Sequence, residues 1–205
     1  MIKEVMVNNI EYRIKKYLGK GKSGYSYLAE REDKYYVIKQ IHHEPCDYYS
    51  FGNKVEAELN SYETLKKIDI TIPILIDVDK EKEIIVKEYI DGPVLIDLIA
   101  NNVIKEEYIS QIFNMTKKLY TVNLNIDYFP TNFVIQDERI YYIDYECNNY
   151  SDEWNFENWG IYFWVSSEKI KSFVDTGNYE LIIKNGKPIK DGLEECVEKW
   201  ISLDK

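Results

Sequence analysis

The sequence predicts an α+β fold in which a small antiparallel β-sheet lobe with one helix precedes a mainly helical lobe. Residues 12–29 and 34–41 are rich in β-branched and aromatic residues and alternate as half-buried strands do. Beyond residue 93 the apolar residues recur at helical spacing instead, most regularly in 106–122. Gly92-Pro93 interrupts regular structure at this change, so we expect lobes at residues 1–90 and 91–205.

The first lobe is expected to be an antiparallel meander. A glycine-rich turn divides residues 12–29 into two strands, and a turn at 32–34 leads to the third. Residues 54–68 have helical composition and contain no helix breaker, so we expect a helix that packs over the sheet. Two more strands are expected at 72–77 and 83–89.

The second lobe is expected to carry most of the helices. The predicted helices are 94–101, 106–122, 159–174 and 192–203. Between them, apolar runs at 133–135 and 140–143 flank a polar turn, which is typical of a β-hairpin. This lobe is therefore helical around one short hairpin.

Size, composition and charge restrict the classes of function. The chain has 205 residues, of which 45% are hydrophobic and 30% charged, so it can bury a core without disulfides. Its net charge of -10 argues against a nucleic-acid partner. Three widely spaced cysteines indicate reduced thiols, and no targeting or membrane-spanning stretch is apparent, so we expect a cytoplasmic protein without a membrane partner.

The first lobe contains residues suited to binding phosphate. Gly19, Gly21 and Gly24 lie between two predicted strands, where missing side chains let backbone amides approach an anion. Lys39 ends an apolar strand and must reach solvent or meet a buried anion. Glu58 lies on the apolar face of the following helix and can be its partner. The alternatives are a hairpin without ligand, an edge-strand lysine and a surface carboxylate.

The second lobe contains residues suited to catalysis and metal binding. Asp127 and Asn132 bracket a proline-containing loop, and Asp144 follows the second strand of the predicted hairpin. The hairpin should therefore bring Asp127 and Asp144 together. Glu146 is equally well explained as a further acidic ligand or as surface charge. A polar turn capped by Asp127 and a turn-initiating Asp144 are the alternatives.

These fragments, in this order over about residues 12–150, resemble the protein-kinase-like superfamily, in particular its short atypical bacterial members. The resemblance implies a two-lobed kinase-like fold in which the three glycines cover the phosphates of ATP. Lys39 would hold the α and β phosphates against Glu58. The backbone at Glu88 and Ile90 would bind adenine.

The same resemblance assigns the catalytic residues. Asp127 would be the catalytic base, and Asn132 and Asp144 would bind Mg²⁺. Phe129 replaces the lysine usual in Ser/Thr kinases. Asp144-Tyr-Glu replaces Asp-Phe-Gly, which is similar to small-molecule kinases of the aminoglycoside and choline type.

The expected function is an ATP-dependent phosphotransferase with a hydroxyl group as acceptor. The intact glycine motif favours a Ser/Thr protein kinase acting on protein. A small-molecule kinase of the aminoglycoside or choline type, or an ATP-binding pseudokinase that serves as an interaction module, are the alternatives.

Overall fold

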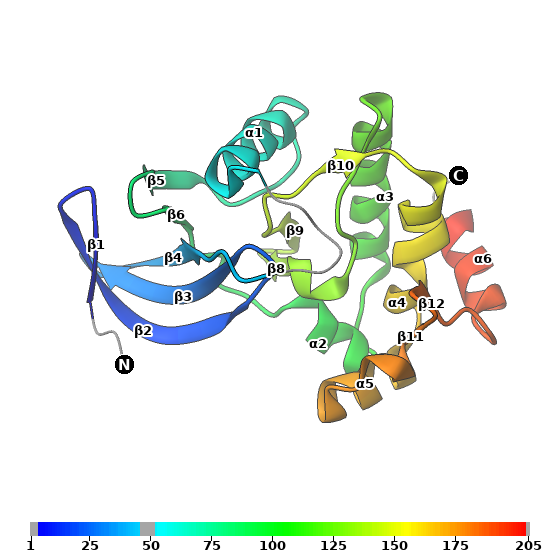
Figure 1. Ribbon diagram of the computed structural model, residues 1–205. Coiled ribbons are helices and arrows are strands. Elements are labelled where there is room, and N and C mark those ends of the chain that lie inside the picture. Colours follow the sequence, from blue (N-terminus) through cyan, green and yellow to red (C-terminus); the bar gives the residue numbers. More distant parts are fainter. Residues whose placement is uncertain (1–3, 46–51, 204–205) are drawn as a thin grey trace. The chain divides into compact units, whose positions relative to one another are not determined.

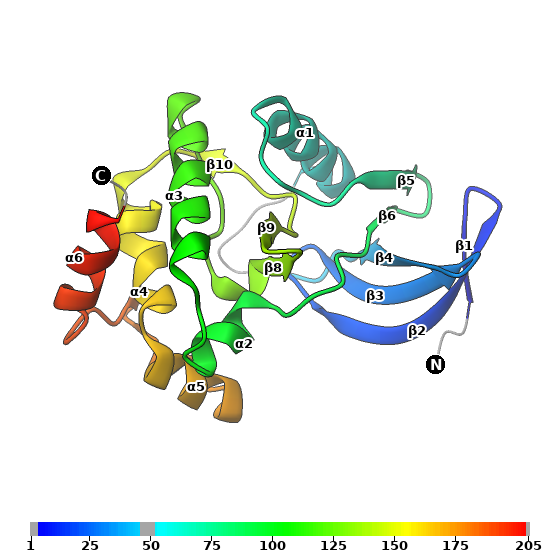
Figure 2. The ribbon, with the colours of Figure 1, turned by 180° about the vertical axis from the view of Figure 1, so that it is seen from behind.

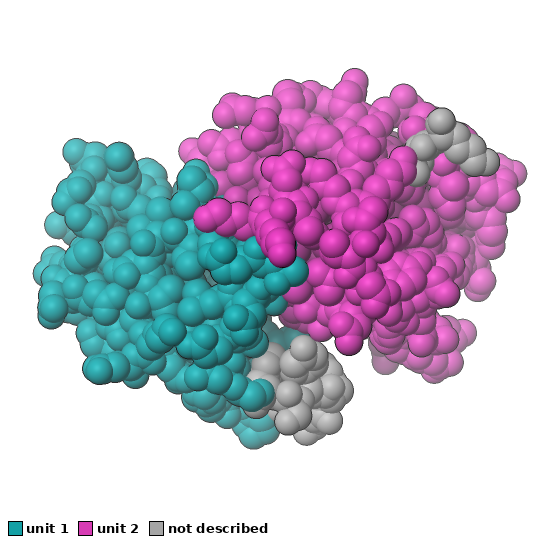
Figure 3. All heavy atoms as spheres, turned by 90° about the horizontal axis from the view of Figure 1, so that it is seen from above, with its two compact units in different colours: residues 1–64, 73–89 teal, residues 65–72, 90–205 magenta. Residues whose placement is uncertain are grey.

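The computed structural model describes residues 4–45 and 52–203 of the chain. The chain divides into two compact units, coloured separately in Figure 3. Unit 1 comprises residues 1–64 and 73–89, and unit 2 comprises residues 65–72 and 90–205. An antiparallel sheet and several helices make up the fold, which confirms the predicted α+β class.

Unit 1 contains a six-stranded antiparallel sheet, drawn from blue to green in Figure 1. Its strands are β1 (Glu4–Val7), β2 (Ile10–Lys20), β3 (Gly24–Arg31), β4 (Lys34–Ile41), β5 (Leu75–Asp79) and β6 (Ile84–Glu88). The spatial order is β1-β2-β3-β4-β6-β5, so the first four strands form a meander and β6 pairs with β4. The meander agrees with the prediction, whereas β1 was not predicted.

The two faces of this sheet bury different apolar clusters because side chains alternate along a strand. On β6, Ile84 and Val86 pack with Tyr12 and other residues of β1–β4. Ile85 points to the opposite face and packs with Ile41 and Val55. Val55 belongs to helix α1 (Lys54–Lys67), so this helix covers one face of the sheet, as predicted.

Two-residue turns in the left-handed region close three hairpins, which is the geometry that matches the twist of antiparallel strands. They join β1 to β2, β3 to β4, and β8 (Phe133–Gln136) to β9 (Arg139–Tyr142) in unit 2. In these three turns the residues with positive φ are Asn8 and Asn9, Glu32 and Asp33, and Asp137 and Glu138. The two turns expected at 32–34 and 136–139 are confirmed.

Unit 2 is mainly helical, and Figure 2 shows its long helix α3 in green. Its helices are α2 (Leu95–Ala100), α3 (Glu106–Thr121), α4 (Ile161–Trp164), α5 (Ser167–Thr176) and α6 (Glu194–Ser202). Two-residue strands form the pairs β7 (Leu124–Asn125) with β10 (Asn148–Asn149) and β11 (Ile183–Lys184) with β12 (Lys187–Pro188). Short 3₁₀ turns lie at Pro130–Asn132, Asp152–Trp154 and Tyr179–Leu181.

One buried apolar cluster holds unit 2 together. It contains one face of α3, the β8–β9 hairpin and the aromatic residues that follow it. Phe113 of α3 contacts Phe156 edge to face, with ring centroids 5.2 Å apart, and Trp164 packs against Phe156 at 5.3 Å. These large rings are fully or almost fully buried, so they account for much of the apolar area that stabilises this unit.

The expected single helix over 159–174 is wrong. The chain forms a π-helical turn at Phe156–Gly160, then α4, and starts α5 only after a break at Val165–Ser166. Gly160 contacts Tyr128 so closely that a Cβ atom there would lie 2.5 Å from Tyr128 Cβ. The irregular turn therefore places a glycine against a buried tyrosine, which helical periodicity does not reveal. The strand expected at 72–77 is also displaced and forms β5.

None of the helices in the described ranges combines the length and apolar character that a membrane span requires. Cys147 is half-buried and Cys196 is exposed, and no disulfide joins these two residues. Cys46, the third expected thiol, lies outside the described residues.

Candidate functional site

The predicted phosphate-binding glycines lie at the β2–β3 turn of unit 1: Gly19 is near the end of β2, Gly21 is in the turn and Gly24 begins β3. Gly21 donates its N–H to the Gly24 carbonyl at 2.8 Å, which closes the turn. A Cβ at Gly24 would lie 2.7 Å from the Gln40 carbonyl oxygen, so packing against β4 requires glycine there. A Cβ at Gly19 would meet no atom within 4 Å, and one at Gly21 would meet only ordinary contact at 3.8 Å. Steric packing therefore explains Gly24 but not the other two glycines.

His42, to which sequence reasoning assigned no role, holds this glycine turn in place. Its backbone N–H donates to the Ser23 carbonyl at 2.9 Å, and its Nε2 lies 3.1 Å from the Gly21 carbonyl. The imidazole also packs on Tyr25 with ring centroids 5.0 Å apart. The sequence does not reveal this contact of His42, because it depends on how β3 and β4 pair.

Lys39 and Glu58 form a buried ion pair beneath the same turn. Lys39 lies on β4 and Glu58 on α1, and each residue is only 7% exposed. Ser23 Oγ donates to Glu58 Oε1 at 2.8 Å, so the glycine turn, the strand and the helix meet at one carboxylate. The predicted pairing is confirmed. Glu58 Oε2 is buried and has no hydrogen-bond partner among the described residues.

The predicted adenine-binding segment leaves the sheet at Glu88, the last residue of β6. The Glu88 N–H donates to the Ile74 carbonyl at 2.9 Å, and the Ile74 N–H donates to Glu88 Oε2 at 3.0 Å. Because the Glu88 N–H is already engaged, only the Glu88 carbonyl oxygen of this residue's backbone is left for the predicted adenine contact. Ile90 begins the second segment of unit 2 and is buried, 4% exposed. Gly92 follows, and a Cβ there would lie 1.8 Å from the Ile135 carbonyl oxygen, so close backbone approach requires this glycine.

Asp127 and Asn132 are the two ends of one closed loop in unit 2. Asp127 Oδ1 accepts from the Phe129 N–H at 3.0 Å, and the Asn132 N–H donates to the Phe129 carbonyl at 3.0 Å. The Asn132 amide Nδ2 donates to the Asp127 carbonyl at 3.2 Å. Because the amide nitrogen turns towards Asp127, the Oδ1 atom of Asn132 faces away from that carbonyl.

Tyr128, at the centre of this loop, fixes it to the core of unit 2. Trp164 Nε1 donates to the Tyr128 carbonyl at 2.9 Å, and both rings are completely buried. Gly160 approaches the other side of Tyr128 at the distance given above. Sequence reasoning missed both contacts, because they join residues that lie far apart in the chain.

Phe129 extends an aromatic cluster from the same loop. Its ring lies 5.1 Å from that of Phe163 and 6.0 Å from that of Phe173. Tyr179, which is 58% exposed, packs on Phe173 at 4.7 Å. Phe129 therefore supplies apolar packing, not a positive charge, two residues after Asp127.

Asp144 lies at the open end of the β8–β9 hairpin, next to Asn132. Phe133 pairs with Tyr142, and the Ile143 N–H donates to the Asn132 carbonyl at 2.9 Å. Asp144 is the next residue, so the ladder brings it alongside the Asn132 end of the loop. Asp144 Oδ1 accepts from the Tyr145 N–H at 3.0 Å, which orients the carboxylate. The hairpin thus places Asp144 alongside Asn132, whose side chain in turn contacts the Asp127 carbonyl.

Tyr142 places a neutral hydroxyl among these acidic groups. Its hydroxyl donates to the Glu146 carbonyl at 2.9 Å. Burial raises the pKa of Tyr142 well above its usual value, and the nearby charges of Asp144, Asp127 and Glu146 raise it further. A hydrogen bond with the Asp127 backbone opposes this shift. The tyrosine therefore stays protonated and links the Asp127 loop to the chain that follows Asp144.

The oxygen atoms of Asn132 and Asp144 suit a magnesium ion. A carboxylate and an amide oxygen are hard ligands, and both side chains are half-buried at one end of the hairpin. Magnesium commonly takes one or two carboxylates and completes its shell with water and phosphate. In the described ranges no three His, Cys, Asp or Glu side chains are grouped as a complete metal site.

No protein-family model and no curated protein matches this sequence.

Proposed function

We propose that the protein is an ATP-dependent phosphotransferase of the protein-kinase-like type, with unit 1 as its nucleotide-binding lobe and unit 2 as its catalytic lobe. The observation that carries the proposal is the buried carboxylate of Glu58. It accepts from Lys39 on the strand and from Ser23 in the glycine turn. Such a pair holds an ammonium group in place for the α and β phosphates.

The glycine turn supports a phosphate-binding role rather than a ligand-free hairpin. Packing accounts for the absence of a side chain at Gly24 but leaves it unexplained at Gly19 and Gly21. Missing side chains let phosphate oxygens approach the backbone of the turn, and the Gly21 N–H is itself engaged with the Gly24 carbonyl. In the proposal, these two glycines are present for the nucleotide, and His42 keeps the turn in its binding shape.

Unit 2 would supply the acceptor chemistry. The Asp127 carboxylate accepts the proton of the acceptor hydroxyl while that oxygen bonds to the γ-phosphorus. The bond from the γ-phosphorus to the bridging oxygen breaks, and ADP leaves with the electron pair. Mg²⁺, for which Asn132 and Asp144 are the candidate ligands, neutralises phosphate charge when it is bound. Tyr128 and Trp164 keep the loop rigid, so that Asp127 needs little reorganisation.

Two classes of acceptor are compatible with the proposal. A hydroxyl of a protein serine or threonine and a hydroxyl of a small molecule fit the Asp127 chemistry equally well, and we favour the protein acceptor because the glycine motif is complete.

Phe129 favours a second candidate function, a nucleotide-binding pseudokinase. Its ring packs on Phe163 and Phe173 at the position where the resemblance leads one to expect a lysine for the transferred phosphate.

Turnover of Mg-ATP by matched variants tests the proposal. Asp127→Asn keeps the size of the side chain and removes the base, so ADP formation should fall by about 10²-fold or more. Asp137→Asn makes the same change in the exposed hairpin turn and should leave turnover unchanged. Protein, hydroxylated metabolites and buffer alone would be offered as acceptors. Equal ADP formation by wild type and Asp127→Asn would contradict the assignment of the base.

A further inference from the structure

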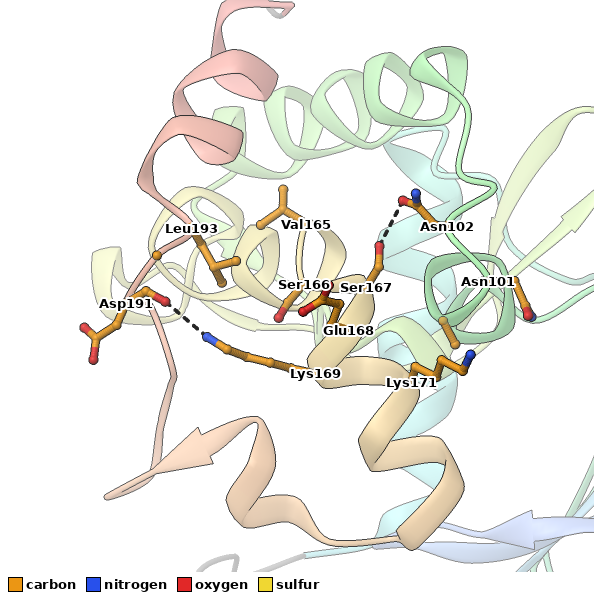
Figure 4. Close-up of a pocket in the computed structure, with 12 residues that line it drawn as sticks. Asn101, Asn102, Val165, Ser166, Ser167, Glu168, Lys169, Lys171, Asp191 and Leu193 are labelled. Atoms are coloured by element: carbon orange, nitrogen blue, oxygen red, sulfur yellow. Dashed lines mark hydrogen bonds between the residues drawn. The ribbon is translucent and has the colours of Figure 1, made fainter.

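A cavity of about 600 Å³ opens beside the first turn of α5 in unit 2. It is lined by parts of segments 100–102, 165–171 and 191–193, shown as sticks in Figure 4. None of the residues assigned to nucleotide, metal or catalysis lines it. The cavity therefore needs an explanation separate from phosphoryl transfer.

Ser166, the residue that precedes α5, presents an unsatisfied hydroxyl to this cavity. The residue is only 5% exposed, yet its Oγ has no hydrogen-bond partner in the described part of the chain. A serine at this position normally caps the helix by accepting from a first-turn amide, and Ser166 does not. Figure 4 shows its oxygen pointing into the space beside Leu193 and Lys169. Buried hydroxyls are normally hydrogen-bonded, so a ligand oxygen that enters the cavity would gain a donor in Ser166 Oγ.

The first turn of α5 adds backbone donors at the same place. The first hydrogen bond along this helix runs from the Ile170 N–H to the Ser166 carbonyl at 2.9 Å. The N–H groups of Ser167, Glu168 and Lys169 therefore have no acceptor within the helix, and the Ser166 side chain does not cap them. The N-terminal end of a ten-residue helix also carries partial positive charge. Together with the Ser166 hydroxyl, these amides place several hydrogen-bond donors on one side of the cavity.

The charged residues around the cavity nearly cancel. Lys169 Nζ lies 3.2 Å from the Asp191 carbonyl oxygen and so is held at the cavity, and Lys171 lies on its exposed edge. The carboxylates of Glu168 and Asp191 also line it and are exposed. Ser167 donates its hydroxyl to Asn102 Oδ1 at 3.2 Å and is already engaged. The rim therefore carries no net charge, and any attraction for an anion comes from Lys169 and the hydrogen-bond donors.

We propose that this cavity binds the phosphate group of a small phosphate monoester. The Ser166 hydroxyl and the first-turn amides of α5 donate to the phosphate oxygens, and Lys169 supplies the cation. The side chains of Ala100, Val165 and Leu193 provide apolar wall for the organic part of the ligand. The volume exceeds that of phosphate alone, so the monoester binds more tightly than inorganic phosphate. This inference does not depend on the phosphotransferase activity.

Amide chemical shifts of the isotopically labelled full chain test the inference directly. Inorganic phosphate and phenyl phosphate would be titrated separately in a chloride buffer at constant ionic strength. Both should shift the amide signals of Ser167, Glu168 and Lys169 in a saturable way, with the tighter constant for phenyl phosphate. Ser166→Ala should weaken binding by about tenfold, the effect of one hydrogen bond to a charged group. Lys169→Gln should weaken it several-fold, and Glu168→Gln should strengthen it.

Matched controls separate this site from general ionic effects. Ser172→Ala on the same helix and Lys184→Gln on β11 should leave both binding constants unchanged. Ser166→Ala should fold normally, since it removes an unsatisfied hydroxyl, and Lys169→Gln gives an independent test if it does not. Shifts that fail to saturate, or that are equal in wild type, Ser166→Ala and Lys169→Gln, would overturn the inference.

Discussion

Replacing Lys39 with methionine should destabilise unit 1 by several kilocalories per mole, because the change leaves a carboxylate buried without its counter-ion. The side chains of Lys39 and Glu58 are each only 9% exposed. Removing one member of such a pair typically costs about 3–5 kcal/mol. Ser23 still donates to Glu58 Oε1 in the variant, so we expect a loss of about 3 kcal/mol, at the lower end of this range.

The double variant Lys39→Met/Glu58→Met should recover most of this loss. No charge then remains in the site, and apolar side chains of similar volume often replace a buried ion pair at little cost. The double variant should therefore be at least about 2 kcal/mol more stable than either single variant. Lys34→Met, on the exposed part of the same strand, should change stability by less than about 0.5 kcal/mol.

Urea unfolding of the four variants and the wild type measures these free energies, and the double-mutant cycle isolates the interaction between the two side chains. Single variants within about 1 kcal/mol of wild type would refute the reasoning, since an exposed pair has that value. A double variant no more stable than the singles would refute it equally, because the two losses would then be independent.

Three further predictions follow from particular contacts. Gly24→Ala should lower the free energy of unfolding in urea by about 1–3 kcal/mol, because its Cβ would collide with the Gln40 carbonyl on β4. Gly21→Ala should leave stability unchanged and weaken Mg-ATP binding in calorimetry. A Gly21→Ala variant that loses stability but binds Mg-ATP normally would contradict a phosphate role. Trp164→Phe removes the hydrogen bond to the Tyr128 carbonyl and should cost about 1–2 kcal/mol in the same urea assay, and an unchanged midpoint would argue against this anchor. Tyr142 has a raised pKa in the folded state, so its contribution to stability is complete below pH 10 and is lost as the pH rises beyond that value. The chain has 19 tyrosines, so the absorbance difference between wild type and Tyr142→Phe isolates this residue, and that difference should appear only together with loss of helical circular dichroism.

Much of the local structure could be predicted because it depends on residues close in sequence. Alternation along 34–41 and the two-residue turns predict the hairpins, and helical spacing places Glu58 on the face that reaches Lys39. The strand β1 was missed because its four residues are too few to show a period. The π-helical turn at Phe156–Gly160 was missed because it packs Gly160 against Tyr128, far away in sequence.

The supporting contacts of the candidate site were the least predictable. Ser23 and His42 are ordinary loop residues in the sequence. Only the folded structure shows that Ser23 binds Glu58 of α1 and that His42 holds the glycine turn. The same is true of Trp164, whose indole lies on the Asp127 loop through a contact between residues 36 positions apart. Motifs name the groups that perform chemistry, whereas the residues that position them are chosen by tertiary packing.

The most direct test of phosphoryl transfer measures Mg-ATP binding and ADP formation on the same samples of wild type, Asp127→Asn and Asp137→Asn. We predict that all three bind Mg-ATP with similar affinity, that wild type and Asp137→Asn form ADP equally fast, and that Asp127→Asn forms it at least about 10²-fold more slowly. Binding without ADP formation by the wild type, with every acceptor offered, would contradict the proposed catalysis and leave a nucleotide-binding module. The absence of binding as well would contradict the nucleotide site itself.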